Sequence, residues 1–443
     1  MKKLISLFMA SMMCVSLFTG CGGQKNETAE GKSAADSGKQ STDVQKAAKL
    51  TWMHHFNEEG AMKWMKIGTD NFIKNNPKVS FDIVTVSGGE YTQLLRTKMA
   101  SGDMPDIYMI DNINSSKEFI DAGYAVDLSG QAFIKNNIME SALAGATLNG
   151  KIWCEPIDTN GFGVTYNKDA FVKAGIKEVP KTYKEFMDAC EKIKQSGVTP
   201  IGAAYKDGWP IGCDIYADVI QTAVKYDPNW KLDIEAGKAK WSEDKGKFKE
   251  ALSRMGERFA YVNSDPFGTD WNKATEMLAT GKVAMIINGT WTVDAARSKK
   301  SDVNLGLFAF PWSDNAADNK FPLKATGGIA VNAKSPNKEM AVKVLEYFSS
   351  QEMGKVFQDN KKAISVIKGL KIDFDPAFAD IEAYIKANNT VNFSTHNPDF
   401  VADEYNKLHE SIITKFLMDK NRDIGKYMKM ADDETAKIAG AKK

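Results

Sequence analysis

The chain has 443 residues, of which 43% are hydrophobic and 26% charged, a composition that excludes collagenous, coiled-coil and mostly disordered proteins. At about 150 residues per domain, this length predicts two or three lobes rather than one small core. The 58 basic and 57 acidic residues leave a formal charge of +1, which gives no electrostatic case for nucleic acid or a polybasic membrane surface as a partner.

The first 21 residues have the pattern of a signal peptide. Two lysines, Lys2 and Lys3, precede an uncharged run over 4–18, which is shorter than the about 20 residues of a membrane-spanning helix. The run leads to small residues and Cys21, an arrangement that resembles the lipobox of bacterial lipoproteins. That resemblance implies cleavage before Cys21 and a lipid on its sulfur, with an ordinary secretory signal as the alternative. We therefore expect the mature protein on the outer face of the cytoplasmic membrane, anchored only by its N-terminal lipid.

The composition of residues 22–49 predicts a flexible tether. Small, polar and charged residues dominate the segment, which contains no aromatic residue, so it cannot bury enough apolar surface to fold. A tether of this kind lets a folded body stand off from the membrane.

The remaining cysteines and histidines do not indicate a metal centre. Cys154, Cys190 and Cys213 are left beyond the lipobox, and their spacing is not that of a metal-binding knuckle. Four histidines, two of them adjacent, give no zinc constellation, so no metal and no other cofactor is expected. The favoured interpretation of the three thiols is small buried hydrophobes, although the sequence leaves open whether two of them pair.

Alternating strand and helix patterns follow the tether. Apolar and β-branched runs predict strands at 50–53, 79–86, 107–110, 283–287 and 329–331. Helical spacing predicts helices at 58–75, 91–100, 115–122, 183–195 (with Thr182 as its N-cap), 272–280 and 338–349. The first five elements alternate strand and helix, which is typical of an α/β protein with a doubly wound, largely parallel sheet.

Four segments with recognisable local patterns occur in order along the chain. They are 100–107 (ASGDMPDI), 150–168 (with GKIW, PID and YNK), 281–291 (with GKVAM and NGTW) and 327–338 (with GG and SPNK). Each segment alone is weak evidence for a family. Together, and following a lipobox, the four segments resemble those of the family 1 extracellular solute-binding proteins. The resemblance covers residues 50–360 and, more loosely, the helical tail.

This resemblance implies an α/β, two-lobe fold of the type II periplasmic-binding-protein kind. Each lobe is expected to hold a mainly parallel sheet with flanking helices, and the ligand is expected in the cleft between the lobes. Three crossing segments at the hinge are expected near 156–161, 288–290 and 332–336. Lobe one would then contain 50–157 and 289–333, and lobe two 161–287 and 336–443.

The resemblance also implies a function in uptake. Such proteins capture a substrate, most often a sugar or an oligosaccharide, and present it to the transmembrane permease subunits of an ABC importer. We expect a monomeric binding protein rather than an enzyme. The alternatives are a secreted glycoside hydrolase, which needs two carboxyl groups about 5–9.5 Å apart, and a surface lipoprotein that binds without transport.

Polar residues at strand ends are the first candidates for a sugar site, which needs carboxylates or amides for the hydroxyl groups. Asp111 and Asn112 follow the strand at 107–110, and His54 and His55 follow the first strand, so all four lie at carboxyl ends. Helix capping, or a turn into the next helix, is the alternative for each pair. Asp158, in the first crossing, is an acceptor that closure could bring to the ligand.

Aromatic residues for the apolar faces of a sugar are the second group. Trp153, Trp209, Trp271 and Trp291 stand in predicted loops or at element ends near the crossings. We expect Trp209 and Trp271 to be stacking platforms whose replacement by alanine weakens binding and leaves the fold intact. Trp291 either stacks on the ligand or packs beneath the hinge, whereas Trp64 is expected to face a lobe core.

Three further candidates rest on the resemblance. Gly328 belongs to the glycine pair of the fourth segment. His396 and Asn397 lie where the helical pattern of the tail breaks, and folds of this kind bring such a loop toward the cleft.

Overall fold

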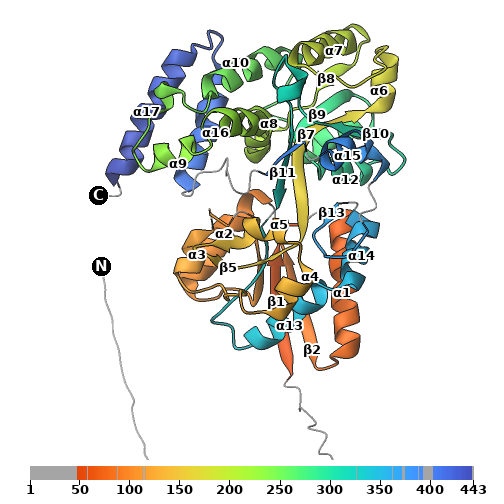
Figure 1. Ribbon diagram of the computed structural model, residues 1–443, viewed down its shortest axis with the longest axis vertical. Helices are drawn as coiled ribbons and strands as arrows, with labels where there is room; N and C mark the ends of the chain where they lie inside the picture. The colour runs from red at the N-terminus through yellow and green to blue at the C-terminus, as the bar shows by residue number, and fades with distance from the viewer. Residues whose placement is uncertain are drawn as a thin grey trace, which may run out of the picture. The chain divides into compact units, whose positions relative to one another are not determined.

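The computed structural model describes residues 47–441 apart from 57, 87, 112, 115, 326, 362, 372–374, 388 and 393–402. The described residues belong to one compact unit, Lys46–Lys443. The predicted signal peptide, Cys21, most of the predicted tether, Asn112, His396 and Asn397 lie outside the described residues. Two sheets with flanking helices organise the described part of the chain (Figure 1).

The first sheet contains the predicted parallel strands. Its order is β2-β1-β3-β12-β6, in which β1 is parallel to β2 and β3, and β12 is antiparallel to β3 and β6. These strands are β1 (Ala48–His54), β2 (Val79–Thr85), β3 (Ile107–Ile110), β6 (Glu155–Pro156) and β12 (Gly328–Val331). All of β3 is buried, as expected of a central strand covered on both faces. Because β1 begins at Ala48, the fold starts slightly before the predicted end of the tether.

Helices pack against the first sheet, and we call this assembly lobe one. They are α1 (Glu59–Asn75), α2 (Gly88–Ser101), α3 (Lys117–Asp121), α4 (Ala132–Asn137), α5 (Glu140–Leu143), α13 (Lys338–Phe348) and α14 (Gln351–Lys361), with a hairpin of β4 (Thr147–Leu148) and β5 (Lys151–Ile152). Trp64 of α1 packs edge-on against Phe348 and Phe357, with ring centroids 5.0 and 5.2 Å apart. Trp64 is therefore a core residue, as its helical spacing predicts.

The second sheet is mixed because its long strand β7 (Asp158–Asn167) is antiparallel to all four of its partners, whereas two other pairs are parallel. Its order is β14-β11-β7-β9-β8, and β10 and β13 also pair with β7. Only the pairs β8–β9 and β11–β14 are parallel. The other strands are β8 (Thr199–Ile201), β9 (Val283–Gly289), β10 (Leu305–Phe308), β11 (Phe321–Ala325), β13 (Ile364–Ser365) and β14 (Thr390–Asn392). The expected mainly parallel second sheet is corrected accordingly.

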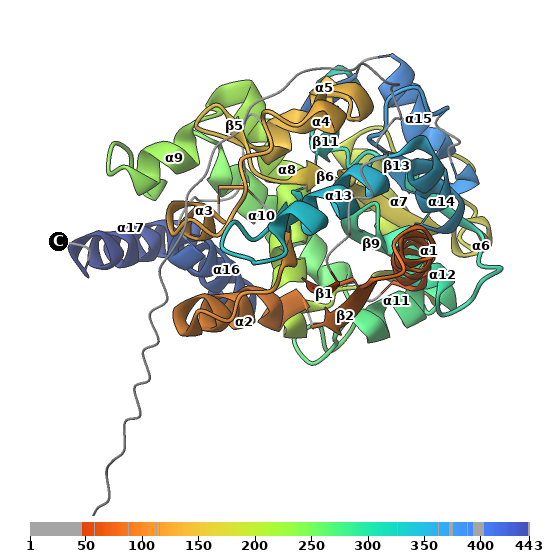
Figure 2. The same ribbon diagram turned by 90° about the horizontal axis from the view of Figure 1, so that it is seen from below.

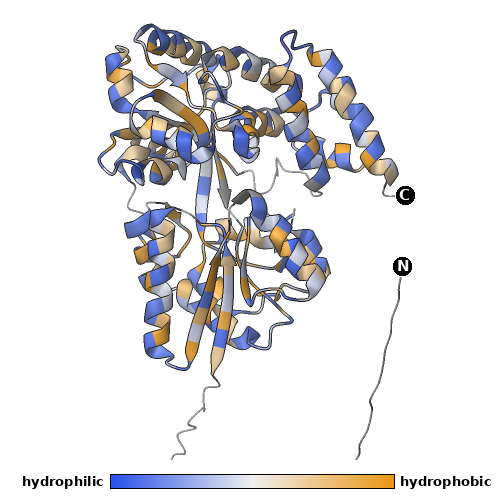
Figure 3. Ribbon diagram, turned by 180° about the vertical axis from the view of Figure 1, so that it is seen from behind, coloured by the Kyte–Doolittle hydropathy of each residue, from blue (hydrophilic) through white to orange (hydrophobic). Residues whose placement is uncertain are grey.

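Helices also flank the second sheet, and together they form lobe two. They are α6 (Lys168–Lys173), α7 (Tyr183–Gln195), α8 (Trp209–Tyr226), α9 (Trp230–Glu235), α10 (Phe248–Arg258), α11 (Trp271–Ala279), α12 (Thr292–Arg297), α15 (Ala379–Lys386), α16 (Asp403–Met418) and α17 (Ile424–Ala441). The outer helices carry hydrophobic and hydrophilic residues on different faces (Figure 3). On α10, for example, Phe248, Ala251, Leu252 and Met255 are buried at helical spacing.

In the part of the chain that the structure describes, three connections pass between the two sheets. The first is Ile157, between β6 and β7, inside the first predicted crossing. The second joins β11 of lobe two to β12 of lobe one, across 326–327. The third lies between α14 and Ala377: β13 pairs with Asp158 and Thr159 of β7, Ile367 lies in the core of lobe one, and Ala377 lies in a core cluster of lobe two.

The predicted second and third crossings, 288–290 and 332–336, are therefore wrong, and so is the division of the lobes that rested on them. The chain over 292–325 belongs to lobe two, because β10 and β11 pair with β7 and α12 contributes to that core. Helices α13 and α14 belong to lobe one, where they contribute buried residues to its core. Local patterns indicate elements, whereas pairing between distant segments decides which sheet each element joins.

Candidate functional site

Strand register brings the carboxyl ends of strands in both sheets to the passage between the lobes. In lobe one, Gly328 at the start of β12 pairs with Ile110 at the end of β3 and with Pro156 at the end of β6. In lobe two, Gly289 at the end of β9 pairs with Phe162 in the middle of β7. Open α/β sheets place ligands at such carboxyl ends, so the region between the lobes where these strands end is the candidate site.

On the lobe one side, His55 and Asp111 form a polar pair just beyond β1 and β3. The Nε2 atom of His55 lies 2.7 Å from Oδ1 of Asp111, and the imidazole packs edge-on against Tyr91 with centroids 5.0 Å apart. Burial works against the charged imidazole, but the charge and hydrogen bond of Asp111, together with the charge of Glu58 and a backbone hydrogen bond, outweigh this effect, so the pKa of His55 is raised. The Asp111 side chain remains 55% exposed, which leaves its carboxylate able to accept a hydrogen bond from a ligand.

Two other predicted residues of lobe one, His54 and Trp153, are held by contacts within the lobe. His54 is fully buried; the Phe56 N–H donates to its Nδ1 atom at 3.1 Å, and the Thr85 hydroxyl lies 3.3 Å from Nε2. Burial lowers the pKa of His54 to about 4, so the ring is neutral at neutral pH. The indole N–H of Trp153 donates to the Leu148 carbonyl at 3.0 Å, which holds this ring against the β4–β5 hairpin. These contacts fit the turn interpretation of His54 and a packing role for Trp153.

Gly328 is explained by backbone packing. A Cβ atom at this position would lie 1.8 Å from the carbonyl oxygen of Glu155, so only glycine lets β12 lie so close to β6. Its place in the candidate site is therefore architectural.

On the lobe two side, three of the predicted tryptophans come together with two further aromatic residues. The ring of Trp209 lies 4.9 Å from Trp271 and 6.4 Å from Trp291, centroid to centroid. Phe162 packs edge-on against Trp291 at 5.5 Å and against Tyr216 at 6.0 Å. We call these five residues the aromatic cluster. Rings of this kind suit the C–H faces of a ligand that also carries polar edges.

Each tryptophan of the cluster stands where a helix of lobe two begins. Trp209 and Trp271 are the first residues of α8 and α11, and Trp291 directly precedes α12. Trp271 is only 7% exposed, and its backbone N–H donates to Oδ2 of Asp207 at 2.7 Å. Trp209 and Trp291 are half-buried, so they offer ring surface to a ligand, whereas Trp271 supports them from the core.

Phe162 and Tyr216 are not among the residues that the sequence predicts for the site. Phe162 lies between two glycines of β7, Gly161 and Gly163, and glycines within a strand often mark a close approach of another group. Tyr216 follows Trp209 by seven positions on α8, so two helical turns place both rings on one face. Both signals are present in the sequence but are weak alone.

Asp158 is buried at the first passage rather than open to a ligand. The residue is 2% exposed, and its Oδ2 atom lies 3.3 Å from the Lys361 ammonium of α14. Its predicted contact with a ligand therefore has no support in this geometry. The ion pair instead joins lobe one to the first residue of β7.

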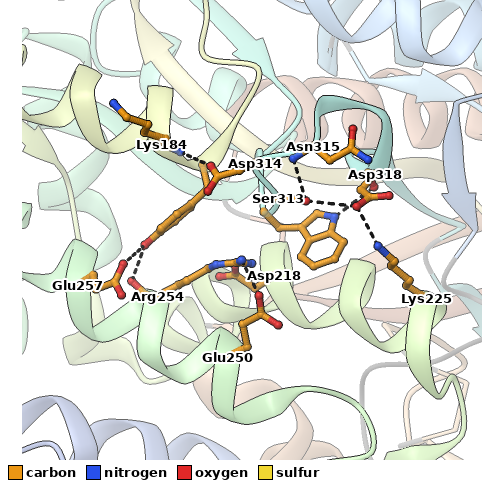
Figure 4. A network of polar contacts seen from close by, with 12 residues as sticks. Lys184, Asp218, Lys225, Glu250, Arg254, Glu257, Ser313, Asp314, Asn315 and Asp318 are labelled. Atoms are coloured by element: carbon orange, nitrogen blue, oxygen red, sulfur yellow. Dashed lines mark hydrogen bonds and ion pairs between the residues drawn. The ribbon is translucent and has the colours of Figure 1, made fainter.

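A separate polar network lies within lobe two, among α7, α8, α10 and the segment after β10 (Figure 4). Lys225 and Asp318 form an ion pair at 2.8 Å, and Arg254 and Glu250 form another at 2.6 Å. The hydroxyl of Tyr183 lies 3.0 Å from a carboxylate oxygen of Glu257 on α10. The Lys225–Asp318 and Tyr183–Glu257 contacts join different elements of lobe two, whereas the Arg254–Glu250 pair lies within α10.

The described residues contain no group of three or more His, Cys, Asp or Glu side chains that could hold a metal ion. Cys154, Cys190 and Cys213 are buried, and no disulfide joins them. Across the same residues, no helix has the length and apolar character needed to cross a membrane.

Two linked α/β lobes with polar and aromatic groups at the linking strands define a solute-binding protein. The profile described as "Bacterial extracellular solute-binding protein" matches residues 57–355, and the chain belongs to this family. The Multiple sugar-binding protein of Streptococcus mutans is 26% identical over 327 residues, which are 72% of this chain and 76% of the relative. The Diacetylchitobiose binding protein DasA of Streptomyces coelicolor is 26% identical over 376 residues, 76% of this chain and 82% of that protein.

Solved structures share the fold. One described as a chitin oligosaccharide binding protein has a TM-score of 0.74 at 21% identity, covering 88% of this chain and 99% of that chain. Another, described as RafE in complex with raffinose, has a TM-score of 0.70 at 21% identity, with coverage of 88% and 99%. The expected family, its binding rather than catalytic class, and the two-lobe fold class are thus confirmed.

Proposed function

We propose that the protein captures a sugar or an oligosaccharide and presents it to the permease subunits of an ABC importer. The names of relatives support this proposal, since one is a multiple sugar-binding protein and another binds diacetylchitobiose. The family match supports a binding protein over the alternative of a glycoside hydrolase.

The observation that carries the proposal is the aromatic cluster at the carboxyl edge of lobe two. Half-buried rings of Trp209 and Trp291 offer apolar faces, and Asp111 offers a carboxylate acceptor at the corresponding edge of lobe one. A sugar presents C–H faces and hydroxyl edges together, so it matches this combination of groups.

Binding is tested by calorimetric titration of the purified mature form with raffinose, stachyose and chitin oligosaccharides. We expect saturable binding of at least one of them and recovery of the sugar intact after incubation. Cleaved sugar would indicate a hydrolase, and a peptide as the only ligand would overturn the sugar assignment.

We also propose that the mature protein is a monomer anchored through a lipid on Cys21. The observation that supports the lipid anchor is the uncharged run that ends in small residues and Cys21. Cys21→Ala should release the protein from the membrane fraction or leave its precursor uncleaved. A variant that fractionates and migrates like the wild type would rule out the lipid anchor.

A further inference from the structure

Four buried polar side chains form a continuous chain across the first passage between the lobes. The Lys361 ammonium, at the end of α14, donates to Oδ2 of Asp158 at 3.3 Å. The Asn160 amide donates to Oδ1 of Asp158 at 3.2 Å, and the Thr290 hydroxyl donates to Oδ1 of Asn160 at 2.9 Å. We call Lys361, Asp158, Asn160 and Thr290 the junction relay.

Every member of the junction relay is nearly inaccessible to water. The exposed fractions are 7% for Lys361, 2% for Asp158, 8% for Asn160 and 5% for Thr290. Removing an ion pair and two further polar groups from water is costly, so the burial of the relay is weak evidence for a contribution to stability. The relay is therefore better explained by positioning than by stability.

The lobe one end of the relay is held by close helix packing. A Cβ atom at Gly60 of α1 would lie 2.3 Å from the carbonyl oxygen of Asn360, so α1 and α14 meet backbone to backbone next to Lys361. The ammonium also lies 4.7 Å from the ring centroid of Phe56. Figure 2 shows α14 and α12 beside α1, which brings the two lobes together at this point.

The lobe two end of the relay reaches the aromatic cluster. The backbone N–H of Thr290 donates to the carbonyl oxygen of Gly161 at 2.9 Å, so both the side chain and the backbone of Thr290 are fixed to β7. The next residue is Trp291, whose ring packs against Phe162 at 5.5 Å. A displacement of β7 at the passage would therefore move Trp291.

We propose that Lys361 and Asp158 are positioning residues that set Trp291, and with it the aromatic cluster, through Asn160 and Thr290. Their proposed effect on binding acts through Trp291. The consequence for affinity rests on the proposed function, whereas the orientation of Trp291 does not depend on any ligand.

Thr290→Val is the sharpest perturbation, because it removes one hydroxyl and keeps the shape of the side chain. Lys361→Met removes the ammonium and leaves Asp158 buried without this partner, while Lys361→Arg keeps the charge and serves as the conservative rescue. The matched control is Thr222→Val on α8. The fully buried hydroxyl of Thr222 donates to the carbonyl oxygen of Val219 at 3.2 Å, a hydrogen bond within α8 that does not include a relay residue.

The primary measurement uses no ligand. Protein labelled with 5-fluorotryptophan gives one fluorine resonance for each of its nine tryptophans, and Trp291→Phe assigns the resonance of Trp291. We expect Thr290→Val and Lys361→Met to shift or broaden that resonance, Lys361→Arg to restore it in large part, and Thr222→Val to leave it unchanged. An unmoved Trp291 resonance in folded Thr290→Val would overturn the proposal, even if Lys361→Met fails to fold.

A calorimetric titration with raffinose measures the effect of the same variants on binding affinity. We expect roughly three- to tenfold weaker binding in Thr290→Val, the effect of one lost hydrogen bond, and no change in Thr222→Val. If the wild type does not bind raffinose, that result counts against raffinose as the ligand of the proposed function. The fluorine spectra still test whether the relay sets the orientation of Trp291. Wild-type affinity in Thr290→Val with a shifted Trp291 resonance would show that the relay does not act on binding.

Discussion

At the residue scale, the half-buried rings of Trp209 and Trp291 are where binding affinity should concentrate. Loss of a buried aromatic contact at a hot spot costs about 2 kcal/mol, hence roughly thirtyfold in affinity. Trp209→Ala and Trp291→Ala should therefore each weaken sugar binding at least about tenfold by calorimetry. Trp153→Ala is the control, since this half-buried tryptophan lies on the hairpin of lobe one. Unaltered affinity in both cluster variants would remove the aromatic cluster from the site.

Trp271 requires a different prediction, because its burial corrects the expectation that its removal leaves the fold intact. The residue is 7% exposed and packs in a core cluster with Ala274 and Leu278 of α11. Truncation of a buried tryptophan typically costs about 3–5 kcal/mol, so Trp271→Ala should lower the unfolding free energy by a similar amount. Chemical denaturation measures this loss. A variant as stable as the wild type, with affinity reduced, would restore the original interpretation.

At the element scale, α8 and α10 are joined by a buried charge cluster that no local pattern indicates. Arg258 of α10 contacts Asp214 at 2.7 Å and Asp218 at 2.8 Å, and all three side chains are at most 4% exposed. Burial raises the pKa of Asp218 to about 6, although Arg258 opposes this effect. The cluster holds together two helices that are far apart in sequence.

Arg258→Met should be strongly destabilising, because it leaves two carboxyl groups buried without their cationic partner. Breaking a buried ion pair costs about 3–5 kcal/mol, and we expect a loss of that size in urea denaturation. Ligand affinity per folded molecule should stay at the wild-type value, since the cluster does not touch the aromatic cluster. The triple variant with Asp214→Asn and Asp218→Asn should recover part of the loss, and no recovery would contradict the assigned cause.

Local sequence signals predicted the bounds of some elements accurately. The helix expected over 183–195 with Thr182 as its N-cap is α7, where the Thr182 side chain accepts from the Glu185 N–H in a capping box. Capping is decided within a few residues, so it can be read from sequence. The composition of the mixed second sheet cannot, because β7 acquires four antiparallel partners from distant parts of the chain.

At the scale of the whole molecule, the contact between the lobes carries an acidic residue whose protonation should affect stability. Burial, and then the nearby Glu58, raise the pKa of Asp294 on α12 to about 7, with Glu59 adding to the rise and Lys361 and Arg297 opposing it. Because this pKa lies above the unfolded value of 3.8, the folded state binds the proton more tightly. The resulting stability is complete below about pH 4 and is lost as the pH rises toward 7.

Asp294→Asn should therefore be more stable than the wild type at pH 8, by about 1–3 kcal/mol, with a smaller difference at pH 5. Urea denaturation of both proteins at the two pH values measures this. Asp188→Asn, which removes an exposed carboxylate of α7, is the control and should not change the pH dependence. Equal losses of stability in Asp294→Asn and the wild type between pH 5 and pH 8 would refute the assignment.

We expect the three passages between the two lobes to act as a hinge, because closure around a ligand is a common motion of two-lobe proteins. We expect the radius of gyration from small-angle scattering to fall when the mature protein is saturated with its sugar. A ligand that binds without changing the radius of gyration would argue against closure as the signal for the permease.

The sequence by itself determined the family and several of the strands and helices, and it predicted part of the candidate site. Apolar strand runs, helical spacing and four short segments are local features, so they can be recognised without knowledge of the fold. His55, Asp111 and the cluster tryptophans were predicted because they follow strand ends or stand where helices begin.

Only the tertiary structure decided which lobe each distant segment joins, how deeply each candidate is buried, and which charges meet. The chain over 292–325 enters lobe two through pairing with β7, and Lys361 meets Asp158 across 203 positions of sequence. The physical reason is that burial and pairing depend on neighbours supplied by the whole fold. A tryptophan at a helix start has the same local sequence whether its ring is half-buried, as for Trp209, or enclosed, as for Trp271.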